Sequence, residues 1–275
     1  MQFAPGEILV FIVVFLFLFL GGFIAGSRKG RPLGNQLLGA FFLTYGLTVL
    51  DGYLVARGIY DRYPRYAFWL NALPMLYGPL LYGYTRSVLD ENFRLERRHL
   101  LHLLPFFLLL SSFILTYHLR PLADKQVWLE HARTENPWYV RLITLLLYGQ
   151  IFAYIVACFR LLRRYRRERR PASLPAGLLW LRFILIAFTV MLSLNLSYNL
   201  VRIAALDLSY TGLIILTAFI FAFILAVLVK ALQYSRIFSA LPAEQASRYV
   251  YSPLSKAEQR QHLVALQQLM EEERP

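Results

Sequence analysis

The sequence has few charged residues and almost no cysteine. Charged residues make up 16% of the 275 residues, against roughly 25% in soluble domains. The single cysteine, Cys158, lies inside an apolar run, so it can build neither a disulfide framework nor a zinc cluster by itself. These shortages exclude a disordered chain, a secreted disulfide scaffold and most soluble enzymes.

Apolar side chains fill most of the chain instead. Hydrophobic residues reach 58% and the mean hydropathy is +0.48. A helix that crosses a membrane needs about 20 mostly apolar residues. Seven segments qualify, namely 8–25, 35–55, 66–85, 100–119, 139–159, 177–200 and 210–230. The sequence therefore predicts an all-α, polytopic membrane protein, with a seven-helix bundle in residues 1–230 and a cytoplasmic segment in residues 231–275.

The positive charge is distributed unevenly between the loops. The net charge is +13, which in a soluble domain would suggest nucleic acid. Here, loops 26–34, 86–99 and 160–176 carry three, four and seven Lys or Arg, 14 in all, whereas the opposite loops carry 7. Because cytoplasmic loops are enriched in Lys and Arg, we expect the N-terminus outside and the C-terminus inside a bacterial inner membrane. Loop 160–176 is then mainly a topology anchor, with a site for anionic lipid or a partner as the alternative.

Several polar side chains interrupt the apolar segments near their outer ends. Such groups are costly in a bilayer, so each one needs a reason. One interpretation is a pocket that opens outward and holds a small polar ligand. The other is helix–helix contact, in which amides contribute about 0.6 kcal/mol each and Asp51 pairs with Arg202 or lies at the interface. The candidate ligand-binding residues are Asp51, Asn71, His118, Asn195, Asn199 and Arg202.

The third predicted span contains Pro74, Gly78 and Pro79. A proline inside a helix removes one backbone hydrogen bond and clashes with an earlier carbonyl. We therefore expect a kink, with the freed carbonyls of Leu70 and Met75 bonded by neighbouring groups. The kink is either a hinge for a signal or a fixed shape that packs the bundle.

Catalytic patterns are scarce. His99 and His102 are three residues apart, and Glu96 lies one turn earlier. This spacing fits a weak metal site, but an interfacial pair beside Arg97 and Arg98 explains it more simply. No convergent acid–base cluster appears, so we expect neither an enzyme, nor a metal, nor a cofactor.

The C-terminal segment predicts an output helix. Ser255 and Glu258 have the spacing of a capping box, which would open a helix over residues 256–273. Leu263, Leu266 and Met270 form a narrow apolar stripe on it. Such a stripe needs a partner, and we expect a homodimer through this helix.

Three segments together resemble a known family. Residues 76–89 (LYGPLLYGYTRSVL), 102–106 (HLLPF) and 251–275 are similar to the membrane-bound AraC-type transcription regulators common in Bacteroidetes. The resemblance implies a seven-helix sensor that precedes two helix-turn-helix units, whose recognition helices read the major groove. Residues 231–275 contain no helix-turn-helix pattern, so we expect no direct nucleic-acid binding by this chain. The predicted function is a signal-sensing membrane module, with a small-molecule transporter or channel as the alternative.

Overall fold

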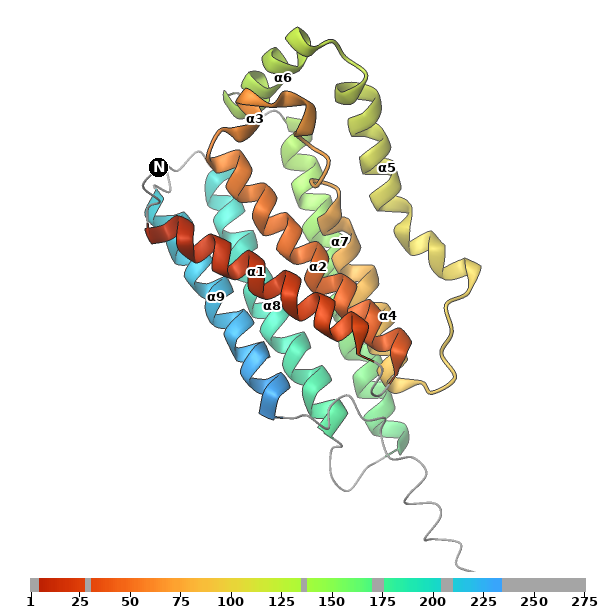
Figure 1. Ribbon diagram of the computed structural model, residues 1–275. Coiled ribbons are helices and arrows are strands. Elements are labelled where there is room, and N and C mark those ends of the chain that lie inside the picture. Colours follow the sequence, from red (N-terminus) through yellow and green to blue (C-terminus); the bar gives the residue numbers. More distant parts are fainter. Residues whose placement is uncertain (1–4, 28–30, 135–137, 170–175, 204–209, 234–275) are drawn as a thin grey trace, which may run out of the picture. The chain divides into compact units, whose positions relative to one another are not determined.

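The computed structural model describes residues 5–27, 31–134, 138–169, 176–203 and 210–233 (Figure 1). Every regular element within these ranges is helical, and the described residues form no strand. The prediction of an all-α protein is therefore confirmed.

Six helices of the described chain pack together as a bundle. They are α1 (Pro5–Gly26), α2 (Pro32–Ala56), α4 (Tyr77–Leu89), α7 (Trp138–Arg169), α8 (Ala176–Ile203) and α9 (Tyr210–Gln233). The other described elements are α3 (Ile59–Arg62), η1 (Pro64–Tyr66), η2 (Leu73–Leu76), η3 (Arg97–Leu103), α5 (Leu104–Phe113), the π-helical η4 (Ile114–His118) and α6 (Leu122–Thr134).

Five helical segments in the described part of the chain are long and apolar enough to cross a membrane. They are Gly6–Gly26, Pro32–Ala56, Arg97–His118, Trp138–Arg169 and Gly177–Val201. A shorter apolar helix covers Ile215–Ala231. These segments coincide with six of the seven predicted spans, and they indicate a membrane protein.

The exposed face of α1 shows how apolar the surface is. Phe11, Phe15, Phe19 and Phe23 follow one another at intervals of four residues and are 43–63% exposed. Residues four apart lie on one face of a helix. In water such a stripe would be unfavourable, whereas in a bilayer it contacts lipid tails.

Small residues let α1 and α2 approach closely. A Cβ added to Gly39 would lie 2.6 Å from both the Ala25 Cβ and the Gly21 carbonyl oxygen. Close backbone approach through small residues is the usual way in which membrane helices associate. Next to this contact, Phe17, Phe41 and Phe188 are fully buried, and the Phe41 and Phe188 rings meet edge to face at 4.4 Å.

The predicted third span, 66–85, is not one continuous helix. Pro74 lies in the first turn of η2, and Pro79 is the third residue of α4. At the start of a helix the missing N–H of proline costs little, because the first N–H groups have no partner inside the helix. The prolines therefore begin helical segments rather than kink a long helix, and this part of the prediction is wrong.

The carbonyls opposite the prolines are bonded by neighbouring groups, as predicted. The Leu73 N–H donates to the Leu70 carbonyl at 3.0 Å. The side-chain amide of Gln150, on α7, donates to the Met75 carbonyl at 3.2 Å. Gln150 thus links α7 to η2, the short helix that precedes α4.

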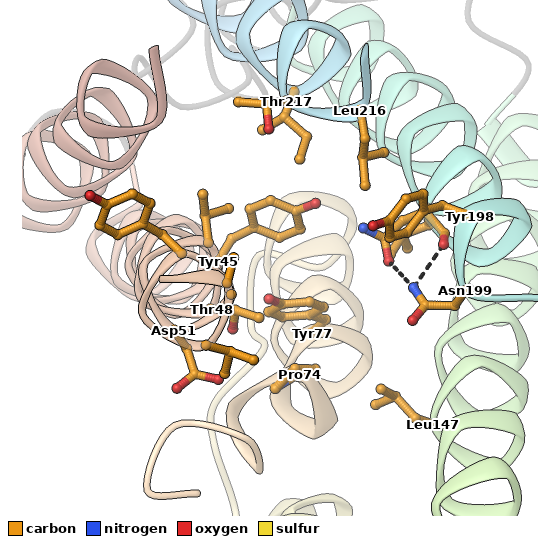
Figure 2. Close-up of a pocket in the computed structure, with 18 of the residues that line it drawn as sticks. Tyr45, Thr48, Asp51, Pro74, Tyr77, Leu147, Tyr198, Asn199, Leu216 and Thr217 are labelled. Carbon is orange, nitrogen blue, oxygen red and sulfur yellow. Dashed lines mark hydrogen bonds between the residues drawn. The ribbon is translucent and has the colours of Figure 1, made fainter. Parts of the chain in front are cut away.

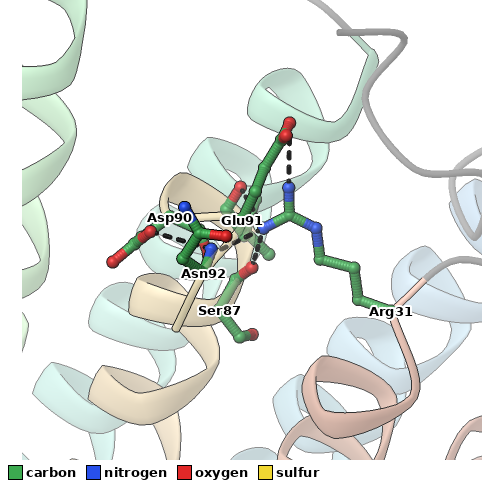
Figure 3. Close-up of polar contacts among 6 residues, drawn as sticks. Arg31, Ser87, Asp90, Glu91 and Asn92 are labelled. Atoms are coloured by element: carbon green, nitrogen blue, oxygen red, sulfur yellow. Dashed lines mark hydrogen bonds and ion pairs between the residues drawn. The ribbon is translucent and has the colours of Figure 1, made fainter. Parts of the chain in front are cut away.

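Arg31 joins the beginning of α2 to the end of α4 (Figure 3). Its guanidinium donates to the backbone carbonyls of Ser87 and Asp90 and pairs with the Glu91 carboxylate at 3.3 Å. Positive charge at the C-terminus of a helix is favourable, because the last carbonyls there have no helical partner. Arg31 therefore holds the start of α2 against the end of α4 and the loop that follows it.

Candidate functional site

A cavity of about 580 Å³ lies between α1, α2, α7, α8, α9 and the start of α4 (Figure 2). We call it the Asp51 pocket. Its volume is within the range of small-molecule sites, roughly 300–1,000 Å³. Its polar lining side chains are Tyr45, Thr48, Asp51, Tyr53, Tyr77, Tyr148, Asn195, Tyr198, Asn199 and Thr217, and the rest of the wall is mainly aliphatic.

Asp51 lies at the α2 edge of the pocket and is 7% exposed. The Tyr60 hydroxyl donates a hydrogen bond to its carboxylate at 2.6 Å. Gly58, with φ of +64°, makes the turn that begins α3 and returns Tyr60 toward α2. Burial, and then the hydrogen bond to Asp51, raise the pKa of Tyr60, so this phenol stays protonated and remains a donor.

Two asparagines on α8 form a network with α7. The Tyr148 hydroxyl donates to the Asn195 side-chain oxygen, and the Asn199 amide donates to the Tyr148 oxygen at 3.0 Å. The Asn199 amide also reaches the Asn195 side-chain oxygen at 3.1 Å. The two amides line the pocket and also join α7 to α8, so the two roles that the sequence suggested as alternatives occur together.

The structure brings together three of the six predicted pocket residues: Asp51, Asn195 and Asn199. The side chain of Arg202 lies outside the described residues. Asn71 and His118 do not line this pocket.

Asn71 and His118 lie in the segments around a separate aromatic cluster. The His118 ring lies tilted against Trp69 with centroids 4.1 Å apart, and the Lys125 ammonium donates to the His118 carbonyl at 2.9 Å. The Asn71 side-chain oxygen and the His118 Nε2 atom are buried without a hydrogen-bond partner among the described residues. Phe68, which has φ of +66°, packs on Tyr117 and Trp128 in the same region.

Sequence reasoning missed the tyrosines of the pocket. Tyr45, Thr48 and Asp51 are spaced by three residues on α2, which places them along one side of the helix. This spacing was visible, but tyrosine also occurs in ordinary apolar packing and at membrane interfaces. Tyr45 and Tyr77 indeed stack on each other, with centroids 5.2 Å apart, and join the aromatic core.

Glu7 is a further residue that the sequence did not single out. It is 6% exposed and pairs with Arg57 at 2.8 Å. This ion pair ties the beginning of α1 to the end of α2. Val10, three residues after Glu7, lines the pocket, so the pair lies next to its α1 wall.

The two histidines of η3 have other partners than a metal. The His99 Nδ1 atom accepts from the Glu96 N–H at 2.9 Å, and the His102 Nδ1 atom lies 2.7 Å from the Tyr154 hydroxyl. Nowhere among the described residues do three or more metal-ligating side chains converge. The predicted output contacts, Leu263, Leu266 and Met270, lie outside the described residues.

No known family model, curated protein or solved structure matches the chain.

Proposed function

We propose that this chain is a membrane-embedded sensor, which binds a small molecule in the Asp51 pocket and passes the signal to a cytoplasmic output. The observation that carries the proposal is the pocket wall. It unites Asp51 of α2 with Asn195 and Asn199 of α8, which lie more than 140 positions apart in the sequence. Polar groups at several points of one apolar cavity are what a specific small-molecule site requires.

The proposed topology has seven spans, the N-terminus outside and the C-terminus in the cytoplasm of a bacterial cell. The charge asymmetry between the loops supports it. In this orientation the pocket lies in the outer half of the bundle, because it is near the start of α1 and the ends of α2 and α8. A ligand would then reach it from the periplasmic side of the inner membrane.

The proposed output is transcriptional. The resemblance of residues 76–89, 102–106 and 251–275 to membrane-bound AraC-type regulators supports a link to a DNA-binding domain that lies outside residues 1–275. The link would run through α9 into residues 234–275.

A transporter or channel is the alternative. It would need a continuous polar path through the bundle, and Gln150 is the polar residue that the sequence places near mid-depth. Its amide, however, bonds the Met75 carbonyl. Beside the pocket, Tyr45, Tyr77 and Phe188 pack into a buried aromatic layer, which favours a closed pocket over a path.

Filling the pocket tests the proposal. Leu216 lines the cavity and is 9% exposed, whereas its neighbour Ile215 is 52% exposed and outside the lining. Leu216→Trp should occupy the cavity, and Ile215→Trp is the matched control on the lipid-facing side. A library of small polar metabolites is screened by thermal unfolding of the purified chain.

Compounds that bind the pocket should stabilise the wild type and Ile215→Trp but not Leu216→Trp. A ligand at a hundred times its Kd stabilises the folded state by about 2.7 kcal/mol, which a thermal shift detects. Equal stabilisation of all three proteins would place binding elsewhere and contradict the proposal.

A further inference from the structure

The described lining of the Asp51 pocket carries charge of one sign. Asp51 is the one carboxylic acid among the described lining residues, and that lining contains no Lys, Arg or His. The nearby Glu7 is already paired with Arg57. Among the described residues, the neutral Tyr60 phenol donates a hydrogen bond to the Asp51 carboxylate. A carboxylate in such surroundings is stabilised by a cation and repels an anion.

The remaining polar surface suits an ammonium group. Five tyrosines line the cavity, namely Tyr45, Tyr53, Tyr77, Tyr148 and Tyr198. Aromatic rings attract organic cations through their negative faces, and this is how proteins recognise quaternary and methylated ammonium groups. Hydroxyl and amide oxygens of the same wall can accept hydrogen bonds from an N–H group. The aliphatic remainder of the wall suits the carbon part of such a ligand.

From this lining we infer that the Asp51 pocket selects a small organic ammonium ion, with Asp51 as the counter-charge and tyrosine rings around the cationic head. The inference rests on the proposed function, because it names the ligand class of the same pocket. It specifies the sign of the charge that the pocket prefers in a ligand, and this preference can be measured without knowing the natural ligand.

Thiol labelling measures that sign. Thr48→Cys on α2 and Leu216→Cys on α9 place a thiol on two different walls of the pocket, in a chain whose buried Cys158 is replaced by Ala. The full chain in nanodiscs is treated with 2-(trimethylammonium)ethyl methanethiosulfonate or with 2-sulfonatoethyl methanethiosulfonate. The two reagents are similar in size and opposite in charge. 2-Mercaptoethanol gives their intrinsic rate ratio, and Tyr66→Cys, 66% exposed in the parent, is the control for surface labelling.

At the pocket thiols, the ratio of the cationic to the anionic labelling rate should be at least ten times the same ratio measured with 2-mercaptoethanol. At an effective dielectric constant of about 20, a unit charge about 8 Å away is sufficient for such a difference. Asp51→Asn keeps an acceptor for Tyr60 and should return the ratio to within about threefold of the intrinsic value. Any effect of the variant on thiol ionisation cancels in the ratio.

Each other outcome has a distinct meaning. If both reagents reach the pocket thiols with the intrinsic ratio, or the anionic one is favoured, the ammonium inference is wrong while the pocket stands. A ratio that Asp51→Asn does not change would also overturn it, because Asp51 would not be the counter-charge. If neither reagent modifies position 48 or 216 while Tyr66→Cys reacts, the cavity is closed to small molecules and the proposed function itself fails.

Discussion

The hydrogen bond from Gln150 to the Met75 carbonyl should stabilise the bundle more when Pro79 is present than when residue 79 has an N–H. The Met75 carbonyl lies in η2, just before α4 begins, where an N–H at residue 79 could reach it as an i→i−4 donor, but proline has no N–H. Gln150 supplies the missing donor from α7 at 3.2 Å. Gln150→Leu keeps the approximate volume and removes the donor. Pro79→Ala restores a backbone N–H and so offers the carbonyl a second partner.

The expected size follows from the surroundings of the carbonyl. Side-chain hydrogen bonds between membrane helices contribute about 0.6 kcal/mol on average and at most about 1.7 kcal/mol. A buried carbonyl left without any partner costs about 1–3 kcal/mol. Gln150→Leu should therefore lower the free energy of unfolding by about 1–2 kcal/mol. In the Pro79→Ala background the same change should cost about 0.5 kcal/mol or less, which gives a coupling energy near 1 kcal/mol.

Equilibrium unfolding of the purified chain in mixed micelles measures all four members of this double-mutant cycle. Thr189→Val is the control, since the Thr189 hydroxyl donates to the Leu185 carbonyl at 2.6 Å within one helix. That carbonyl still has a helical N–H partner, so the control should cost less than about 0.5 kcal/mol. A coupling energy of zero, with Gln150→Leu equally costly in both backgrounds, would refute the idea that Gln150 compensates for Pro79.

Three further predictions concern topology, the Arg31 contact and the output helix. Reporter fusions should report the cytoplasm after Leu33, Arg94 and Arg170 and the outside after Asp61, Asp124 and Asp207, and an outside signal at Arg170 would overturn the topology. Arg31→Gln should destabilise the fold by about 1–2 kcal/mol in an unfolding titration, because it removes the charged hydrogen bonds to the end of α4. Glu91→Gln should cost less than about 1 kcal/mol, because that carboxylate is half exposed. A cysteine at position 266, in a chain without Cys158, should cross-link in membranes if residues 256–273 pair in a dimer, and absence of the cross-link in correctly inserted protein would contradict the dimer. Leu266→Asp should break the dimer without preventing insertion.

Hydropathy predicted most of the helices because the bilayer leaves so few alternatives. A segment such as Pro32–Ala56 must satisfy its backbone groups internally, so a long apolar run implies a helix. The same reasoning failed at 66–85, where Ala67 is extended and Phe68 has a positive φ. Apolar composition does not reveal that a chain near an interface can bond its carbonyls to neighbouring groups instead of its own helix.

The pocket was only partly predictable for a different reason. The cost of burying Asp51, Asn195 and Asn199 is a property of each residue, so it can be inferred from the sequence. Whether they share a cavity depends on how α2 and α8 pack, which no local pattern specifies. Asn71 and His118 have the same intrinsic cost, yet they lie outside the pocket wall. The tyrosines were missed because their rings serve packing and binding equally well.

The pocket wall also suggests how binding would be transmitted in the proposed sensor. Leu216, Thr217 and Ile220 of α9 line the cavity, and Ile224 and Val227 continue the same helix into the fully buried core. A ligand shifts an equilibrium only by its differential affinity for the two states, and moving a population from 1:99 to 99:1 takes about 5.5 kcal/mol. Contacts of an ammonium ion with Asp51 alone would anchor the ligand equally in both states. The difference must therefore come from groups that move, and α9 both lines the cavity and directly precedes residues 234–275 in the sequence. Changes at Leu216 or Ile220 should accordingly alter the ratio of affinities between the two states, whereas Asp51→Asn should weaken binding to both.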